Sequence, residues 1–487
     1  MHVAWNMLEF GHYQKRTGRR RPRKNRRVTR VFNHYLSRGM LLLMMVELCA
    51  LLLTLPAASG IGRTLAAAPP LWGEQNLAFA LLMLALLAAF GLYRRDFEEG
   101  LGSMIFRVVT SFASGFVILF VASKGMPTPG WSAREIAQAC VLGGGAILLL
   151  RVIFFRWADL DILKQRILVL GTGTRAAKIG ALLRESGGAK RLHVVGFLPL
   201  QGTHHFVDHS QILPDQVPLT DIVDKYQIDE ILIAIRERRG GGLPVNELLD
   251  CKLKGINVIE LSTFFERERG QVQLESLNTS WMVLADGFHQ GFLRDTVKRI
   301  FDLSVSLSIL VLSLPVMIVT AILIVLESGF PLLYRQERVG QGGRVFTIYK
   351  FRSMAQNAEK DGKPQWAQAG DARVTKVGRV IRKLRIDELP QIINVFKGDM
   401  SFVGPRPERP FFVNQLIEQV PYYASRHSIK PGITGWAQVR YPYGASLEDA
   451  IEKLQYDLYY VKNHTFFLDL LILFQTALVV LFGKGAR

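Results

Sequence analysis

The first third of the chain alternates long apolar runs with short polar loops. The runs lie near residues 40–58, 77–93, 104–122 and 136–155. Each is close to the length of helix that crosses the hydrocarbon core of a bilayer. The pattern predicts four transmembrane helices within residues 39–157, preceded by a polar arm at residues 1–38.

The loops between these runs differ in charge. Basic residues gather before the first run, between the second and third, and at the end of the fourth: Lys15–Arg30, Arg94, Arg95, Arg151 and Arg156. Positively charged loops stay in the cytoplasm, so the N-terminus, the middle loop and everything after the fourth run should be cytoplasmic. Glu47 lies inside the first run, where an ionisable side chain serves either a function or helix packing.

The arm before the first run is strongly basic. Ten Lys or Arg residues and no acid lie between Lys15 and Arg30. Such a run predicts a disordered arm against anionic lipid head groups. Nucleic acid is the rival partner, but a hydrophobic helix follows almost at once, so we expect membrane lipids and no nucleic acid. A net charge of +19, a mean hydropathy of +0.18 and three widely spaced cysteines agree with a membrane protein without a disulfide framework.

A change of pattern after the fourth run predicts an α/β domain. Residues 166–180 read as a β-strand, a glycine turn and the start of a helix, with Gly171 and Gly173 in a dinucleotide-binding pattern. Further strands are expected at 193–200 and 229–235. Together they predict a Rossmann-like cytoplasmic domain within residues 158–280.

The cofactor of this domain is not fixed by the pattern. A dinucleotide site needs an acid after the second strand to accept from the ribose hydroxyl, and none closes the strand near His193–Phe197. We therefore interpret the domain as a degenerate scaffold or regulatory unit. A nucleotide bound at Gly171 and Gly173 stays open as the alternative.

The most informative apolar segment is Val305–Leu326, which carries no charge and contains Pro315. It is long enough to span a bilayer. Basic residues flank both of its ends, however, which argues for two cytoplasmic ends. A proline-broken helix at about residues 300–327 that enters one leaflet and returns would satisfy both observations.

Residues 375–410 concentrate the candidate chemistry. Basic residues alternate with apolar ones at helical spacing from Lys376 to Arg385, which predicts an amphipathic helix. A second helix is expected to begin at Asp387 as its N-cap, with Pro390 in the first turn. The start of a helix favours negative charge, so it suits a carboxylate or an incoming phosphate.

Two adjacent carboxylates, Asp387 and Glu388, lie at this predicted helix start. Neighbouring side chains on a helix point about 100° apart, so they cannot form a facing acid/base pair. We expect one to attack phosphorus as a covalent nucleophile and the other to hold Mg²⁺, which prefers carboxylate and phosphate oxygens. The plain alternative is a helix cap followed by a solvated acid.

Three segments resemble a known family. They are RQERVGQGGRVFTIYKFRSM (335–354), TKVGRVIRKLRIDELPQIINVFKGDMSFVGPRPERP (375–410) and KPGITGWAQV (430–439). Their order and sequence are similar to those of the bacterial sugar transferases, the monotopic polyprenyl-phosphate glycosyl-1-phosphate transferases. The resemblance covers about residues 295–487. It implies an α-rich catalytic domain at 281–487 with a re-entrant membrane helix, in a long-form member that begins exopolysaccharide, capsule or O-antigen synthesis.

The resemblance also implies roles for individual residues. Three basic side chains would meet substrate phosphate oxygens: Arg338, Lys350 and Arg352. Arg406 stands between two prolines that fix the backbone, so its guanidinium could clamp a phosphate with two hydrogen bonds. Asp469 would orient a basic residue of the active site, and Pro315 would break the membrane helix. The alternative for each arginine is a contact with the surface or with lipid head groups. We also expect 430–439 to form a surface loop over the site and Phe466–Phe482 to lie at the membrane interface.

The reaction implied by the resemblance is a ping-pong phosphotransfer. Asp387 would attack a UDP-sugar and release UMP, and undecaprenyl phosphate would then collect the phosphosugar. Glu388 with Asp387 would bind Mg²⁺, or Mn²⁺ in its place. The enzyme would work on the cytoplasmic face of the bacterial inner membrane. The sequence leaves the oligomeric state open, and a homodimer is our expectation. The sugar is not fixed, although glucose and galactose are our first expectations.

Two other classes of function stay open. The Rossmann-like unit could be the enzyme, an NAD-dependent modifier of nucleotide sugars, in which case a fragment ending near Arg294 would keep redox activity. The chain could instead be a non-catalytic scaffold for polysaccharide assembly, in which case Asp387→Asn would leave polymer production intact.

Overall fold

The structure is a computed structural model of the whole chain. It describes residues 28–31, 34–60, 73–93, 101–125, 132–158, 165–185, 192–200, 205–214, 217–235, 243–274, 291–355, 373–441, 444 and 446–482. The chain divides into two compact units. One contains residues 155–264, and the other contains 30–154 and 265–487.

Long apolar helices form the region predicted to cross the membrane. They are α2 (Arg38–Gly60), α3 (Glu74–Ala89), α4 (Leu101–Gly125) and α5 (Ala133–Ala158). Among the described residues, α2, α4, α5 and the later helix α11 are long and apolar enough to cross a bilayer. Helix α3 has only 16 residues, about 24 Å, so it is shorter than the hydrocarbon core. Three of the four predicted spans are therefore confirmed by length and composition.

The ionisable residue in the first span is fully paired. Glu47 of α2 forms an ion pair at 2.7 Å with Arg151 of α5, and both side chains are completely buried. Arg151 also donates to the backbone oxygen of Leu92, and the Tyr93 hydroxyl donates to Glu47. These contacts join three segments of the bundle, so the packing interpretation of Glu47 is the one its surroundings favour.

Two short strands precede α2. Strands β1 (Val28–Val31) and β2 (His34–Ser37) pair with each other at the end of the segment expected to be a disordered arm. The rest of that arm, and the loop that carries Arg94 and Arg95, lie outside the described residues.

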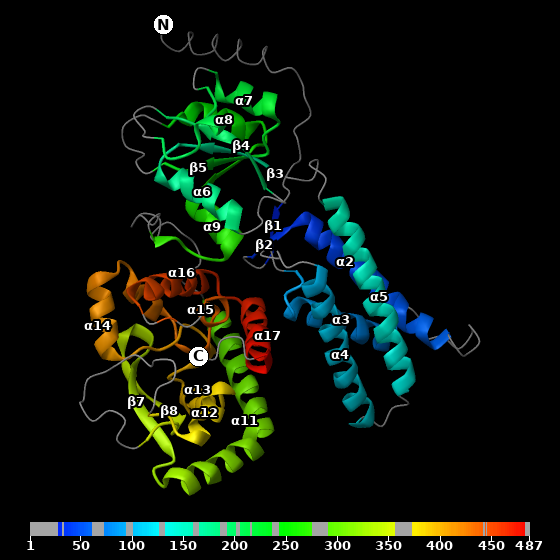
Figure 1. The fold of residues 1–487 in the computed structure, drawn as a ribbon, viewed down its shortest axis with the longest axis vertical. Coiled ribbons are helices and arrows are strands. Elements are labelled where there is room, and N and C mark those ends of the chain that lie inside the picture. The colour runs from blue at the N-terminus through cyan, green and yellow to red at the C-terminus, as the bar shows by residue number, and fades with distance from the viewer. Residues whose placement is uncertain are drawn as a thin grey trace. The chain divides into compact units, whose positions relative to one another are not determined.

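A parallel sheet forms the centre of the unit at 155–264. Its strands are β3 (Gln165–Leu170), β4 (Leu192–Leu198), β5 (Glu230–Ile233) and β6 (Asn257–Glu260), in the order β4-β3-β5-β6. The connecting helices are α6 (Thr174–Glu185), α7 (Leu219–Tyr226) and α8 (Val245–Leu253), with a short turn η4 (His209–Gln211) after β4. Figure 1 shows α7 and α8 on one face of the sheet and α6 on the other. The predicted strands are present and parallel.

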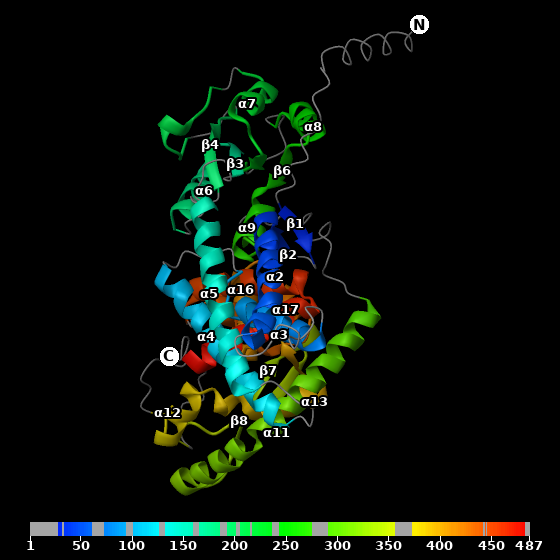
Figure 2. The same cartoon turned by 90° about the vertical axis from the view of Figure 1, so that its right-hand side faces the viewer.

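The longest helix of the chain is α11, from Phe292 to Ser328. Its 37 residues correspond to about 56 Å. Pro315 lies inside it without ending it, and Figures 1 and 2 show the helix as one long element that turns along its course. Only 11% of this helix is buried, so most of its apolar surface is exposed. The helix thus continues through Pro315, where the sequence predicted an interruption.

The elements after α11 form the C-terminal part of this unit. A hairpin of β7 (Leu333–Val339) and β8 (Val345–Phe351), joined by η6 (Gln341–Gly343), is followed by α12 (Lys376–Lys383), η7 (Ile386–Gln391) and α13 (Ile392–Lys397). Then come β9 (Ser401–Val403), α14 (Pro410–Gln419), η8 (Tyr423–Ser428), β10 (Gly432–Thr434), α15 (Trp436–Arg440), α16 (Leu447–Asn463) and α17 (Phe466–Phe482). Helix α9 (Leu261–Arg269) precedes α11.

The segment at 430–439 is not the surface loop that its turn residues suggested. Gly432–Thr434 forms strand β10, which pairs in parallel with β9. A Cβ added at Gly432 would lie 2.0 Å from the backbone nitrogen of Gly404, so the two segments approach too closely for any side chain. Trp436 is also buried and donates to the backbone oxygen of Gly270. The segment therefore supports the loop that follows β9.

Candidate functional site

The carboxylate pair lies on a 3-10 turn that follows α12. Thr375 caps α12 by accepting from the amide of Gly378, and Arg385 ends it with a left-handed φ of 58°. The chain then enters η7 at once, so Asp387 lies in the first turn and is not the N-cap. Pro390 lies inside this turn without an amide hydrogen to donate, and the 3-10 geometry extends to Gln391.

Glu388 lies at the centre of a cluster of cations. Its Oε1 atom is 2.9 Å from Lys350 Nζ on β8 and 2.8 Å from Arg406 Nη2. Arg385 Nη1 approaches the same oxygen at 3.8 Å. Burial alone would raise the pKa of Glu388, but Arg406, Lys350 and Arg385 hold it well below its usual value. Glu388 is therefore a fixed negative charge that positions two predicted phosphate-binding residues.

Asp387 is held differently. Its side chain is buried, and within the described parts of the chain its Oδ1 atom has no hydrogen-bond partner. Burial and the neighbouring Glu388 raise the pKa of Asp387 to about 6. Most copies are therefore ionised at neutral pH, with one carboxylate oxygen unused. A buried and unsatisfied carboxylate is costly to keep, so it suggests a function rather than a contribution to stability.

Arg406 is positioned by the close packing around it. Its backbone oxygen accepts from Arg426, whose guanidinium also forms a buried ion pair at 2.7 Å with Asp457 of α16. The preceding Gly404 donates to the backbone oxygen of Thr434 on β10. Flanking prolines restrict the backbone further. The guanidinium of Arg406 is thus presented to Glu388 from a rigid loop.

Two of the predicted phosphate-binding arginines contact the protein's own backbone. Arg338 on β7 donates to the backbone oxygen of Pro407 and lies 3.5 Å from Glu408. Arg352 donates to the backbone oxygens of Ser328 and Gly329 at the end of α11. In these contacts Arg338 fixes the loop that carries Arg406, and Arg352 fixes the end of α11. Neither has an ion pair with Asp387 or Glu388 in the described part of the chain.

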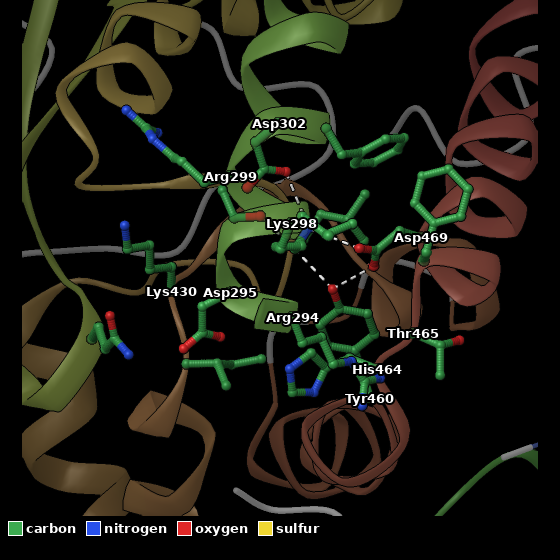
Figure 3. Close-up of a pocket in the computed structure, with 17 residues that line it drawn as sticks. Arg294, Asp295, Lys298, Arg299, Asp302, Lys430, Tyr460, His464, Thr465 and Asp469 are labelled. Atoms are coloured by element: carbon green, nitrogen blue, oxygen red, sulfur yellow. Dashed lines mark hydrogen bonds and ion pairs between the residues drawn. The ribbon is translucent and has the colours of Figure 1, made fainter. Parts of the chain in front are cut away.

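Asp469 belongs to a separate network. Its Oδ2 atom is 2.9 Å from Lys298 Nζ on α11, and its Oδ1 atom accepts from the Tyr460 hydroxyl at 2.6 Å. Lys298 also contacts Asp302 at 3.1 Å. Figure 3 shows this network beside a cavity. The basic residue that Asp469 orients is therefore Lys298, and not one of the four predicted phosphate-binding residues.

Residues that follow β4 contact the glycine turn after β3. Gly171 has a φ of 110°, and a Cβ there would lie 3.1 Å from the backbone oxygen of Ala234. The amide of Phe206 donates to the backbone oxygen of Thr172, and His205 Nδ1 lies 2.8 Å from the Thr172 hydroxyl. Gly171 thus serves the tight turn. A Cβ on Gly173 would meet nothing within 4 Å, so space does not require glycine there.

The carboxylate pair can serve as part of a magnesium site. Mg²⁺ is commonly held by one or two carboxylates together with substrate phosphates and water. Asp387 offers one unused oxygen. No group of three or more potential metal ligands of the His, Cys, Asp and Glu types exists among the described residues. The donor set therefore fits a magnesium ion only if substrate oxygens complete its coordination.

Several residues of these networks were not found from the sequence. Lys298 and Asp302 stand four apart on one helix, a spacing that could have suggested a pair. Arg426, Asp457 and Tyr460 carry no local signal because each meets partners from distant segments.

The family model for bacterial sugar transferases matches residues 293–483 of the chain. A UDP-N-acetylgalactosamine-undecaprenyl-phosphate N-acetylgalactosaminephosphotransferase of Aeromonas hydrophila is 44% identical over 259 residues, which cover 53% of this chain and 60% of that protein. The chain thus spans less than two thirds of the length of this relative.

Two shorter relatives are covered more fully. A UDP-glucose:undecaprenyl-phosphate glucose-1-phosphate transferase of Caulobacter vibrioides is 41% identical over 186 residues, which cover 37% of this chain and 68% of that protein. An uncharacterised sugar transferase of Bacillus subtilis is 42% identical over 195 residues, which cover 39% of this chain and 90% of that protein. The transferase region of the present chain thus matches nearly the whole of the Bacillus protein. On this ground the chain belongs to the bacterial sugar transferase family.

Proposed function

We propose that the protein transfers a sugar 1-phosphate from a UDP-sugar to undecaprenyl phosphate, and so initiates the synthesis of a bacterial polysaccharide. The observation that carries the proposal is the buried carboxylate of Asp387, whose Oδ1 atom has no hydrogen-bond partner in the described part of the chain, beside a glutamate held by two cations. The named activities of the Aeromonas and Caulobacter relatives supply the two substrate classes.

In the first step an oxygen of Asp387 attacks the phosphorus atom attached to the sugar. A bond forms between this oxygen and phosphorus, the bond between phosphorus and the bridging oxygen breaks, and UMP leaves with that electron pair. The product is a phosphosugar carried on Asp387. The raised pKa of Asp387, about 6, leaves its carboxylate ionised at neutral pH without making it a poor nucleophile.

In the second step the phosphate of undecaprenyl phosphate attacks the same phosphorus atom. The bond to Asp387 breaks, the carboxylate is regenerated, and undecaprenyl-diphosphate-sugar departs. Because the donor is soluble and the acceptor is a lipid, a covalent intermediate lets a single site meet them in turn.

The cations around Glu388 stabilise the charge that develops in both steps. Lys350 and Arg406 lie within 2.9 Å of Glu388, which holds both cations beside the residue that follows Asp387 in the sequence. Donors held in place before the reaction need no reorganisation when negative charge builds up on the phosphoryl oxygens. Magnesium bound by Glu388 or Asp387 with the diphosphate oxygens would neutralise further charge.

The long apolar surface of α11 provides the lipid connection. Most of this helix is exposed, and both of its ends carry contacts to the catalytic region: Lys298 to Asp469 near the start, and Arg352 to Ser328 at the end. A re-entrant course, bent at Pro315, would keep the site at the head groups on the cytoplasmic face of the inner membrane. The lipid tail of the acceptor then stays in the bilayer, which avoids exposing its apolar surface to water.

The test is UMP release by the purified full-length protein with undecaprenyl phosphate, Mg²⁺ and a panel of UDP-sugars. The panel includes N-acetylgalactosamine, glucose and galactose because the relatives differ in the sugar that they transfer. Asp387→Asn is the test variant, and Glu418→Gln, on the exposed side of α14, is a control that also removes one negative charge. Release from one donor that is lost only in Asp387→Asn supports the proposal. Release from none, by folded protein, contradicts it.

A further inference from the structure

A cavity of 290 Å³ lies between the start of α11, the start of α17 and the residues before β10. Figure 3 shows Lys430 and Asp295 on one side of it, and Arg294 and His464 on the other. Its lining includes Asp302 and Asp469 but none of the residues that surround Glu388 in the candidate active site. The cavity is therefore a separate feature of the catalytic unit.

Two basic side chains of the lining, Arg294 and Lys430, form no close ion pair with a described residue, although Asp469 and Asp295 act on Arg294 electrostatically. Arg294 Nη2 is a buried atom that has no hydrogen-bond partner in the described part of the structure. Lys430 likewise has no ion pair with any described residue. Lys298 differs, because Asp302 and Asp469 both contact it. An unsatisfied guanidinium nitrogen at the edge of a cavity indicates an anionic ligand, since leaving it bare is costly.

The start of α11 indicates where this cavity lies relative to the bilayer. Arg294, Lys298 and Asp302 recur every four residues and face the cavity. Leu293 and Ile300 lie on the opposite side of the helix and are 78% and 60% exposed. The uncharged membrane segment begins one turn later. An exposed apolar face beside a polar one is typical of a helix lying at the level of lipid head groups.

The cavity itself has an apolar edge. Val297 and Phe466 both line it, and they are 46% and 55% exposed. Phe301, which packs against Phe466 with ring centroids 5.1 Å apart, completes this edge. A ligand that fits would present an anion to Arg294 and Lys430 and an apolar chain to Val297 and Phe466.

We propose that this cavity binds the phosphodiester head group of an anionic membrane phospholipid, and that the bound lipid joins α11 to α17. Its volume is at the small end of ligand sites, which suits a head group whose acyl chains stay in the bilayer. Four basic and three acidic residues line the cavity: Arg294, Lys298, Arg299, Lys430, Asp295, Asp302 and Asp469. This near balance suits a singly charged diester better than the more highly charged monoester of the acceptor lipid.

Native mass spectrometry of the full-length protein tests the proposal. The protein is purified in detergent and mixed separately with phosphatidylglycerol, phosphatidylcholine, undecaprenyl phosphate and inorganic phosphate. The double variant Arg294→Gln and Lys430→Gln removes the two cations. The control, Lys376→Gln with Arg335→Gln, removes two exposed cations elsewhere in the same unit. Thermal melting of each protein without added lipid shows whether it is folded.

We expect wild type and control to retain phosphatidylglycerol in preference to phosphatidylcholine, and the cavity variant to retain at least fivefold less. Equal retention by all three proteins would overturn the proposal. If the cavity variant instead lost only its binding of undecaprenyl phosphate, the cavity would be assigned to the acceptor and the proposal would fail. It would also fail if inorganic phosphate alone displaced the phosphatidylglycerol, because the cavity would then bind a soluble anion. If the double variant does not fold, Lys430→Gln alone is compared with Lys376→Gln.

Discussion

Asp387 and Asp469 are both buried aspartates of the catalytic unit, but their surroundings differ. Asp469 is 1% exposed, and both of its oxygens have partners in Lys298 and Tyr460. Asp387 is 8% exposed, and one of its oxygens has no partner in the part of the chain that the structure describes. A buried carboxylate whose oxygens all have partners can stabilise the fold. One with an unpartnered oxygen lowers the stability of the fold, so its presence suggests a function. The comparison teaches that burial and charge alone do not distinguish a structural acid from a reactive one.

The largest expected effect follows from removing the unsatisfied carboxylate. Asp387→Asn should lower UMP release by about a thousandfold or more, because no other described side chain can form the intermediate at that position. Its melting temperature should stay the same or rise by about 2–4 °C. Removing a buried charge whose Oδ1 atom has no hydrogen-bond partner in the described part of the chain should raise the free energy of unfolding by about 1 kcal/mol. Asp399→Asn serves as the control. A large drop in melting temperature would show that Asp387 is structural after all.

Removing the second carboxylate should affect both activity and stability. Glu388→Gln leaves Lys350 and Arg406 without their shared anion. We expect UMP release to fall by about a hundredfold and stability to fall by about 2 kcal/mol, less than for a fully buried pair because both cations are partly exposed. Steady-state kinetics and thermal melting measure the two effects, and Glu418→Gln is the matched control. A loss of activity without any loss of stability would contradict the role assigned to the cluster.

The pH dependence should reflect the raised pKa of Asp387. Its carboxylate must be ionised to attack, so the rate should fall about tenfold for each pH unit below about 6. Because the folded-state pKa is raised, the contribution of this group to stability is largest at low pH and is lost as the pH rises through about 6. Protonation of Asp387 therefore does not unfold the protein at pH 5, so a slow reaction at that pH reflects the loss of the nucleophile. A rate that stays constant from pH 7 to pH 4.5 would exclude this assignment.

The smallest effect on the reaction is expected from the satisfied aspartate. Asp469→Asn weakens the contact with Lys298, which keeps Asp302 as a partner. Stability should fall by about 2–3 kcal/mol, while UMP release at low temperature should change by less than about tenfold. Asp469→Asn is compared with Asp399→Asn, a partly exposed acid that does not line the cavity. Loss of activity as complete as in Asp387→Asn would remove the distinction between the two aspartates.

The sequence predicted the elements better than their contacts. The periodic pattern from Lys376 to Arg385 predicted a helix, which the structure confirms and ends at Lys383. Apolar runs predicted the strands β3, β4 and β5 but not β6. The start at Asp387 was wrong because the left-handed Arg385 begins a 3-10 turn one residue earlier. Local propensity does not specify such a turn, because Arg385 must adopt a left-handed backbone conformation that is uncommon for residues other than glycine.

Contacts between distant segments were the least predictable part of the site. Gly404 and Gly432 lie in motifs full of turn residues, yet the two motifs meet as paired strands too close for a side chain. The pairing of Asp469 with Lys298, which stand 171 positions apart in the numbering, follows from tertiary packing alone. The pattern at Gly171 and Gly173 matched a nucleotide site, whereas in the fold Phe206 and His205 contact that turn.

The central claim is that Asp387 carries the phosphosugar, and the direct measurement omits the acceptor. Wild-type protein is mixed with the active UDP-sugar and Mg²⁺ but no undecaprenyl phosphate, and UMP release and the mass of the peptide containing Asp387 are followed together. We expect a burst of about one UMP per active site and a phosphosugar on that peptide, removed when undecaprenyl phosphate is added. UMP release that requires the acceptor from the start, with an unmodified peptide, would contradict the account.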